Sequence, residues 1–80
     1  MTLEDIRNHL SQKYGNTHHF LGSVELQNLL IIRNPKTHRA ITVVRKHGEI
    51  RISRGGLSEP EALIDATQIK SLQQIEAWLD

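Results

Sequence analysis

The 80-residue chain has a net charge of +1, 22 leucine, isoleucine and valine residues against three aromatic ones, and no cysteine. A chain of this length folds as one domain around one core, so we expect a single compact domain over residues 1–80 with no room for a deep substrate cavity. The missing cysteines exclude disulfides, thiolate metal sites and thiol redox chemistry, and they fit a cytoplasmic protein.

The first predicted element is a helix from about residue 3 to residue 14. Thr2 is a suitable N-cap because its hydroxyl can accept a hydrogen bond from a free amide of the first turn, and the acidic residues after it complement the helix dipole. Gly15 and Asn16 end the helix. The residues of its apolar stripe are Leu3, Ile6, Leu10 and Tyr14.

Two strands are predicted next. Residues 17–21 favour a short strand that ends at the turn-forming pair Gly22-Ser23. Residues 26–33 contain an apolar run that is too short for an isolated helix, and it stops at Asn34-Pro35, which neither a helix nor a central strand would continue. We therefore expect a strand from Leu26 to Arg33.

A turn at residues 34–37 connects this strand to the next one, because proline presets one backbone angle and asparagine can bond its own backbone. A four-residue loop sets the pairing across the turn. It places Arg33 opposite His38, Ile32 opposite Arg39, Ile31 opposite Ala40 and Leu30 opposite Ile41.

Residues 39–54 are typical of a β-hairpin. Two β-branched runs, 41–44 and 50–53, flank His47-Gly48, a two-residue turn in which glycine adopts positive φ without steric cost. The turn sets the register. It pairs Lys46 with Glu49, Arg45 with Ile50, Val44 with Arg51 and Val43 with Ile52.

The predicted pairing divides the side chains between two faces of the sheet. The core face carries Leu30, Ile32, Ile41, Val43, Ile50 and Ile52. The other face is mixed, apolar and mostly basic, and carries Leu29, Ile31, Ala40, Thr42, Val44, Lys46, Glu49, Arg51 and Ser53. Either the chain or a partner must cover its apolar part.

The sequence pattern of the C-terminal part of the chain predicts helices. Ser58 with Glu61 three residues on, and Pro60 in the first turn, indicates a helix start, and this helix reaches about Asp65. Two alternatives follow: one helix running on to Leu79, or an extended break at 66–70 and a separate helix capped by Ser71, which we prefer. The apolar stripe comprises Ile69, Leu72, Ile75 and Leu79, with Trp78 at its edge.

Together these elements predict an α+β fold. It consists of an antiparallel meander of three to four strands, with an N-terminal helix and C-terminal helices packed on one face. No stretch approaches the roughly 18 apolar residues of a membrane span, and residues 1–5 lack the basic start of a signal peptide. We expect a soluble protein without membrane contact.

No pattern of catalytic or metal-binding residues is present. His18 and His19 are adjacent, so on a strand they point to opposite faces and cannot hold one ion. The serines lack a nucleophile motif, and the paired acidic residues belong to helix starts. Gly55-Gly56 lacks the lysine of a phosphate loop. We therefore expect a protein without enzymatic activity, metal or cofactor.

The charge distribution is uneven. Residues 33–54 hold seven lysines and arginines against Glu49 alone, whereas the remainder of the chain is acidic. Apolar side chains among arginines are typical of protein interfaces, so we expect a protein-binding, regulatory or self-associating module. The alternative is a nucleic-acid-binding protein that uses the basic strands. The predicted binding residues are Leu29, Ile31, Arg39, Val44, Arg45, Lys46, Arg51 and Arg54.

Overall fold

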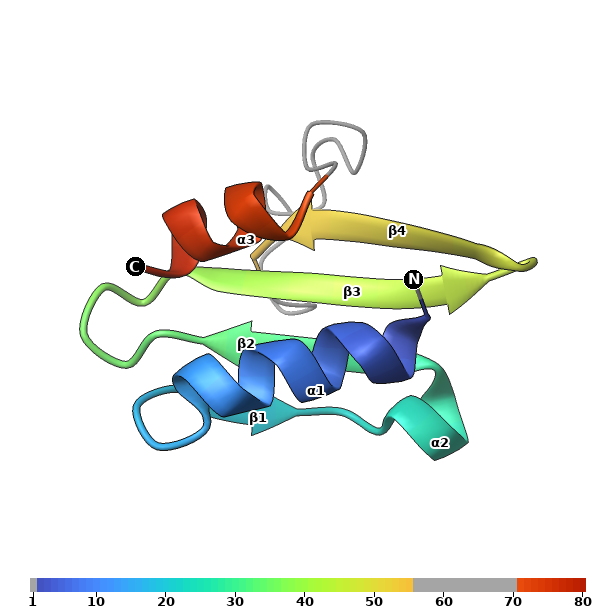
Figure 1. The fold of residues 1–80 in the computed structure, drawn as a ribbon, viewed down its shortest axis with the longest axis horizontal. Helices are drawn as coiled ribbons and strands as arrows, with labels where there is room; N and C mark the ends of the chain where they lie inside the picture. Colours follow the sequence, from blue (N-terminus) through green and yellow to red (C-terminus); the bar gives the residue numbers. More distant parts are fainter. Residues whose placement is uncertain (1, 56–70) are drawn as a thin grey trace.

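The computed structural model of the protein describes residues 2–55 and 71–80. In chain order its elements are α1 (Leu3–Tyr14), β1 (His19–Leu21), α2 (Val24–Gln27), β2 (Leu29–Arg33), β3 (Ala40–Lys46), β4 (Glu49–Arg54) and α3 (Leu72–Leu79). The four strands form one antiparallel sheet in the order β1, β2, β3, β4 (Figure 1). The predicted α+β fold with an antiparallel meander is confirmed.

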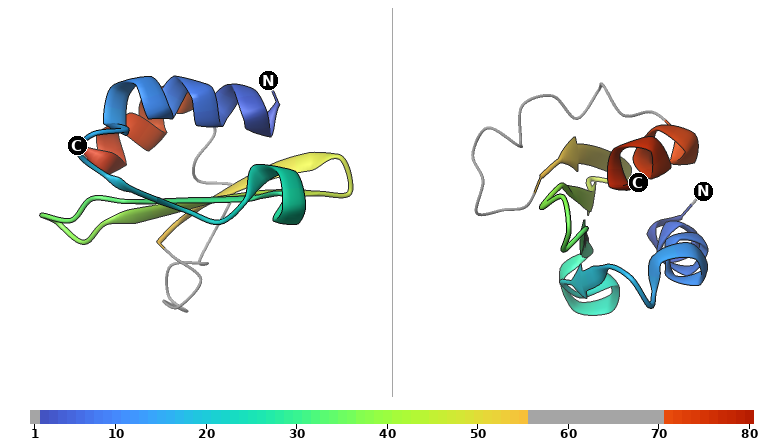
Figure 2. Two further views of the ribbon diagram at one scale, coloured as in Figure 1. Left: turned by 90° about the horizontal axis from the view of Figure 1, so that it is seen from below. Right: turned by 90° about the vertical axis from the view of Figure 1, so that its left-hand side faces the viewer.

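Both long helices lie on the same face of the sheet (Figure 2). We call this the inner face; its strand residues are Leu30, Ile32, Ile41, Val43, Ile50 and Ile52. α1 lies on the side of β1 and β2, and α3 lies beside β3 and β4 (Figure 1). The opposite side of the sheet is the outer face, and neither α1 nor α3 covers it.

The hydrophobic core fills the space between the inner face and the two helices. The period of two along the strands and of three to four along the helices points these side chains at one another, as predicted. The core residues are Leu3, Ile6, Leu10, Tyr14, Val24, Leu30, Ile32, Ile41, Val43, Ile52, Ile75 and Leu79. Phe20, Ile50, Leu72 and Trp78 pack against them and are partly buried.

The predicted N-cap of α1 is present. The amide of Asp5 donates to Thr2 Oγ1 at 3.0 Å, and the Thr2 amide donates to Asp5 Oδ2 at 3.1 Å, which closes a capping box. These bonds to Thr2, the backbone one above all, hold the pKa of Asp5 below its usual range. The helix therefore starts at Leu3, and its apolar stripe faces the sheet.

The two hairpins differ in how well their register was predicted. β3 and β4 pair as expected around His47 and Gly48, whose φ angles of 53° and 76° suit a two-residue turn. The β2–β3 prediction was wrong by two residues, because Ile32 lies opposite Ile41 and Leu30 opposite Val43. The loop contains six residues, 34–39, and a shift of two keeps every side chain on its predicted face.

The predicted start of the second strand was also wrong. β2 begins at Leu29, because the preceding residues form the one-turn helix α2. Ser23 caps α2 by accepting from the Leu26 amide at 3.1 Å, and Asn28 ends it in the left-handed conformation with φ 53°. A single turn is too short to produce an apolar period in the sequence.

At the C-terminus, α3 begins at Leu72 after the predicted cap Ser71, whose hydroxyl accepts from the Gln74 amide at 3.2 Å. Ser71 has extended backbone angles, so no continuous helix runs through it to Leu79. The predicted helix at 58–65, the break at 66–70 and Ile69 lie outside the described residues.

Polar contacts join α3 to α1 at the surface above the core. His9 Nε2 lies 3.0 Å from Glu76 Oε1, and Lys13 Nζ lies 3.6 Å from Glu76 Oε2. The Tyr14 hydroxyl donates to Asp80 Oδ1 at 2.6 Å, and burial together with this bond raises the pKa of Tyr14. The two helices are thus tied by charge as well as by apolar packing.

We expect Glu76→Gln to lower the melting temperature at pH 7 and to have a smaller effect at pH 3. Hydrogen bonding with His9, aided by the charge of Lys13, holds the pKa of Glu76 below its ordinary value of 4.5. A lowered folded-state pKa means that these contacts stabilise the protein above about pH 4.5 and lose this effect as the pH falls through the folded value. The loss at pH 7 should stay below about 1 kcal/mol.

The control for this measurement is Glu49→Gln. The Glu49 carboxylate lies 3.9 Å from Arg51 Nη2 and is 72% exposed, so its neutralisation should leave the melting temperature unchanged at both pH values. If Glu76→Gln lowered the melting temperature equally at pH 3 and pH 7, ionisation of Glu76 would not be the source of its contribution.

Candidate functional site

The outer face displays five of the eight predicted binding residues. Strand pairing arranges its side chains in rows, because residues directly opposite one another point to the same side. One row contains Leu21, Ile31, Thr42 and Ser53, and the next contains Leu29, Val44 and Arg51. The predicted binding residues that lie on this face are Leu29, Ile31, Val44, Lys46 and Arg51.

Four apolar side chains form a continuous group on the β1 and β2 side of the outer face. We call Leu21, Leu29, Ile31 and Val44 the apolar strip. Leu21 is 54% exposed, and the other three are half-buried. Gly22, at a φ of 85°, allows the chain after Leu21 to pass close to Leu29. A Cβ at this position would lie 2.9 Å from the Leu29 carbonyl oxygen and 3.2 Å from the Leu29 Cγ.

Leu21 was not among the predicted binding residues. β1 has only three residues, so the alternation of polar and apolar side chains along it is too short to show which face Leu21 belongs to. The signal was the pairing: β1 runs antiparallel to β2 and places Leu21 opposite Ile31.

Basic side chains flank the apolar strip. We call Arg33, Lys46 and Arg51 the basic rim; all three are exposed residues of the outer face. Arg51 Nη2 lies 3.9 Å from Glu49 Oε2, and Arg33 Nη2 lies 3.0 Å from His38 Nδ1. Arg33 is a second residue that the sequence did not single out. Strip and rim together have the composition of a protein interface, with an apolar centre and a charged margin.

A further part of the outer face is closed to solvent. Thr42 has no exposed surface, and Ala40 and Ser53 are 3% and 8% exposed. The Thr42 hydroxyl donates to the Gly55 carbonyl, so its polar group is satisfied inside the protein. Among the described residues, the accessible part of the outer face therefore consists of the apolar strip, the basic rim, His19 and Glu49.

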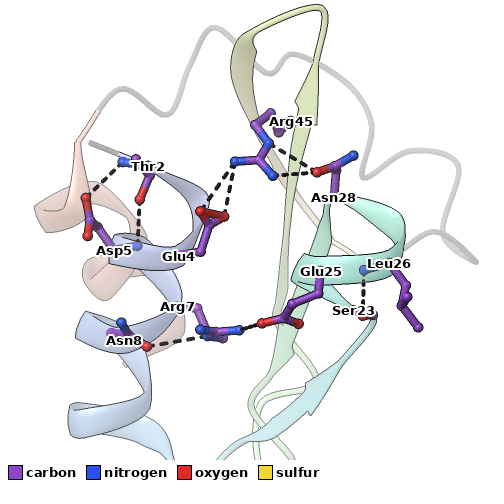
Figure 3. Close-up of polar contacts among 10 residues, drawn as sticks. All are labelled: Thr2, Glu4, Asp5, Arg7, Asn8, Ser23, Glu25, Leu26, Asn28 and Arg45. Atoms are coloured by element: carbon purple, nitrogen blue, oxygen red, sulfur yellow. Dashed lines mark hydrogen bonds and ion pairs between the residues drawn. The ribbon is translucent and has the colours of Figure 1, made fainter.

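Arg45 lies on the inner side of the sheet and ties three elements together (Figure 3). Its Nη1 donates to Glu4 Oε1 at 3.1 Å, and its Nη2 and Nε donate to Asn28 Oδ1 at 2.6 and 3.1 Å. These bonds join β3 to α1 and to the residue that ends α2. The guanidinium of Arg45 is thus engaged within the fold.

Arg39 and Arg54 also lie on the inner side, where both contact Trp78 of α3. The guanidinium carbons are 4.7 Å and 4.8 Å from the centre of the indole ring. Trp78 Nε1 donates to the Ala40 carbonyl at 2.8 Å, which fixes the ring. The structure thus separates the predicted binding residues into two groups on opposite faces, five on the outer and three on the inner.

A shallow depression of about 390 Å³ lies between α1 and β1. Phe20, Val24 and Leu30 contribute apolar walls, and Arg7 and Glu25 lie at its margin. The two charged side chains form an ion pair with each other (Figure 3).

The two adjacent histidines have different surroundings. His18 Nε2 donates to the Leu79 carbonyl at 3.0 Å and its ring lies 4.5 Å from that of Tyr14, whereas His19 is exposed on the outer face. Over residues 2–55 and 71–80, no three His, Asp or Glu side chains are grouped so that they could hold a metal ion. None of the helices in these ranges is long and apolar enough to cross a membrane.

The chain matches no known protein family, no curated protein and no solved structure.

Proposed function

We propose that this protein is a small, non-enzymatic, protein-binding module that acts through its outer sheet face. The observation that carries the proposal is the exposed apolar strip inside a basic rim, on the side of the sheet that α1 and α3 leave uncovered. Contiguous apolar surface flanked by arginine is the composition of protein interfaces, in which a desolvated centre supplies most of the affinity.

Charge complementarity selects the partner. Two copies of this chain packed face to face would bring the basic rims together, and like charges at an interface oppose association. A partner segment with acidic side chains around an apolar stripe would fill the strip and neutralise the rim. We therefore propose an acidic, amphipathic segment of another protein as the occupant, in a regulatory or scaffolding complex.

A synthetic peptide tests this proposal. The probe is a helical peptide of about 18 residues with leucines on one face and glutamates elsewhere, labelled for fluorescence anisotropy. Wild-type protein should bind it, and Ile31→Asp should weaken binding by at least about tenfold, or ~1.4 kcal/mol, because it charges the centre of the strip. Lys46→Gln should weaken it by less and mainly at low salt.

The matched control is Leu26→Asp. Leu26 belongs to α2, is not one of the four residues of the strip and is 88% exposed, so this variant adds the same charge outside the strip and should bind the peptide like wild type. A version of the peptide with lysines in place of glutamates should not bind. Equal affinity of Ile31→Asp and wild type, or no binding by either, would contradict the proposal.

Sedimentation of the pure protein at two salt concentrations tests the choice of partner. We expect a monomer at both. A salt-tolerant dimer that Ile31→Asp dissociates would identify a second copy of this chain as the occupant in place of an acidic partner. A steeply salt-dependent complex with duplex DNA or RNA that Lys46→Gln weakens would show instead that the basic rim of the outer face binds nucleic acid.

A further inference from the structure

The ion pairs of the described residues leave a specific set of cations without a carboxylate. Within residues 2–55 and 71–80, each glutamate and Asp80 lies next to a basic side chain: Glu4 by Arg45, Glu25 by Arg7, Glu49 by Arg51, Glu76 by His9 and Lys13, and Asp80 by Lys13. Asp5 belongs to the capping box of α1. Among residues 2–55 and 71–80, the lysines and arginines outside these pairs are Arg33, Lys36, Arg39, Lys46 and Arg54.

Four of these five cations gather at one end of the sheet. We call Arg33, Lys36, Arg39 and Arg54 the basic end. Arg33 ends β2, Arg54 ends β4, and the loop that carries Lys36 and Arg39 joins β2 to β3. Arg33 pairs with Ala40 and Arg54 pairs with Ile41, so both arginines lie beside the start of β3, at the same end of the sheet as the loop. No acidic residue occurs from 33 to 48 or from 50 to 55.

Two of these cations are held in place by an aromatic ring. Arg39 and Arg54 both lie against the indole of Trp78, which is anchored by its bond to the Ala40 carbonyl. A guanidinium that stacks through its flat face keeps its edge N–H groups free to bind two oxygens of one anion. Stacking therefore fixes Arg39 and Arg54 before any ligand binds and reduces the entropy lost on binding.

The loop positions the remaining cations. Asn34 Oδ1 accepts from the Lys36 amide at 2.8 Å, and Arg33 Nη2 lies 3.0 Å from His38 Nδ1. Arg33 points from the outer face, whereas Arg39 and Arg54 lie on the inner side with Trp78. The basic end thus presents charge on both sides of the sheet edge, which suits an extended anion better than a single small one.

The basic end lacks the features that a protein partner or a stacked base would use. Among residues 2–55 and 71–80, the exposed large hydrophobic side chains are Leu21 and Leu26, and neither belongs to the basic end, so these residues give it no exposed apolar centre. Trp78 is partly buried and in contact with both arginines, so its ring is not presented as a platform for a base. A phosphate polymer needs only positioned cations. We propose that the basic end binds the phosphate backbone of a nucleic acid without reading its sequence.

Salt dependence is the test. A labelled duplex of about 20 base pairs, as DNA and as RNA, is titrated with the full chain between 50 and 200 mM salt. Each phosphate contact contributes about −0.9 to the slope of log affinity against log salt, so four cations give a slope of about −3 to −4 and a loss of about 10²-fold over this range. Arg39→Gln and Arg54→Gln should each flatten the slope by about one.

Two controls separate this site from general charge effects. Lys46→Gln removes an equally unpaired cation at the far end of the sheet. It should leave the salt slope of duplex binding unchanged, although it weakens binding of the acidic peptide. Arg39→Lys keeps the charge and should keep the slope. The fluorescence of Trp78 and the melting temperature of each variant verify that α3 remains in place.

Three results would overturn this inference. The first is no binding to either duplex at 50 mM salt. The second is that Lys46→Gln and Arg39→Gln flatten the slope of log affinity against log salt equally, which would show that only the net charge matters. The third is competition by polyglutamate at the same charge concentration as the duplex, which would identify an acidic protein as the ligand. None of them depends on the apolar strip, so the two proposals can fail separately.

Discussion

Replacing Ile32 by alanine should lower the free energy of unfolding by about 2–5 kcal/mol, whereas the same replacement of Ile31 should cost under about 1.5 kcal/mol. Ile32 has no exposed surface and points into the core between the inner face and α1. Ile31 is its neighbour on β2 but points to the outer face, where it is half-buried. Chemical denaturation followed by circular dichroism measures both values.

The two replacements make a matched pair. Each removes the same atoms and the same β-branched preference for a strand, so the difference between them reports burial alone. Ile32→Val, expected to cost about 0.5–1.5 kcal/mol, keeps the comparison measurable if the alanine variant does not fold. Equal losses at the two positions would mean that the outer face at Ile31 is covered, and the proposed docking surface would then be lost as well.

The parts of the fold that could be predicted are those set by interactions between residues close together in the sequence. The register of β3 and β4 follows from His47-Gly48, because a two-residue turn leaves a single way to pair the strands. The β2–β3 loop has no such constraint. Asn34 donates its backbone amide to the Arg39 carbonyl and accepts from the His38 amide, and it closes a six-residue loop where the composition indicated four.

The faces were predicted correctly although the β2–β3 register was not. An error of two residues is invisible to a pattern of period two, and only a shift of one would have exchanged the core and outer sides. The α2 turn is a different case. Its cap Ser23 and its left-handed Asn28 act on single backbone groups, and a four-residue helix has no period to detect.

The candidate sites depended on contacts between distant segments. The sequence indicated that residues 33–54 are basic, but not that Arg45 is engaged by Glu4 and Asn28, nor that Trp78 holds Arg39 and Arg54. These partners are far apart along the chain and meet only when α1 and α3 pack on the sheet. Strand alternation alone separates Arg45 and Arg54 on the core side from Lys46 and Arg51 on the other side. Local patterns carry no information on the partners that engage these arginines, and those are evident only in the structure.

Asn34→Ala should lower the free energy of unfolding by about 2–3 kcal/mol and should loosen α3 before the rest of the fold. Asn34 is 7% exposed, and its Nδ2 donates to the Leu79 carbonyl at 2.8 Å, in the last turn of α3. Carbonyls at a helix end have no partner within the helix, and the Leu79 carbonyl is satisfied by this side chain together with His18 Nε2. Its Oδ1 also accepts from the Lys36 and Thr37 amides.

A comparison of the amide hydrogen-exchange rates of residues 75–80 with those of β3 measures whether α3 loosens first. Protection in α3 should fall more than protection in β3, because the lost bond connects the loop to α3 and not to the sheet. Thr37→Ala is the control: the Thr37 hydroxyl accepts one exposed bond from the Arg39 amide at 3.3 Å, so its loss should cost a few tenths of a kcal/mol. A uniform loss of protection after Asn34→Ala would show that α3 and the sheet unfold together, and that Asn34 does not act as a local anchor of α3.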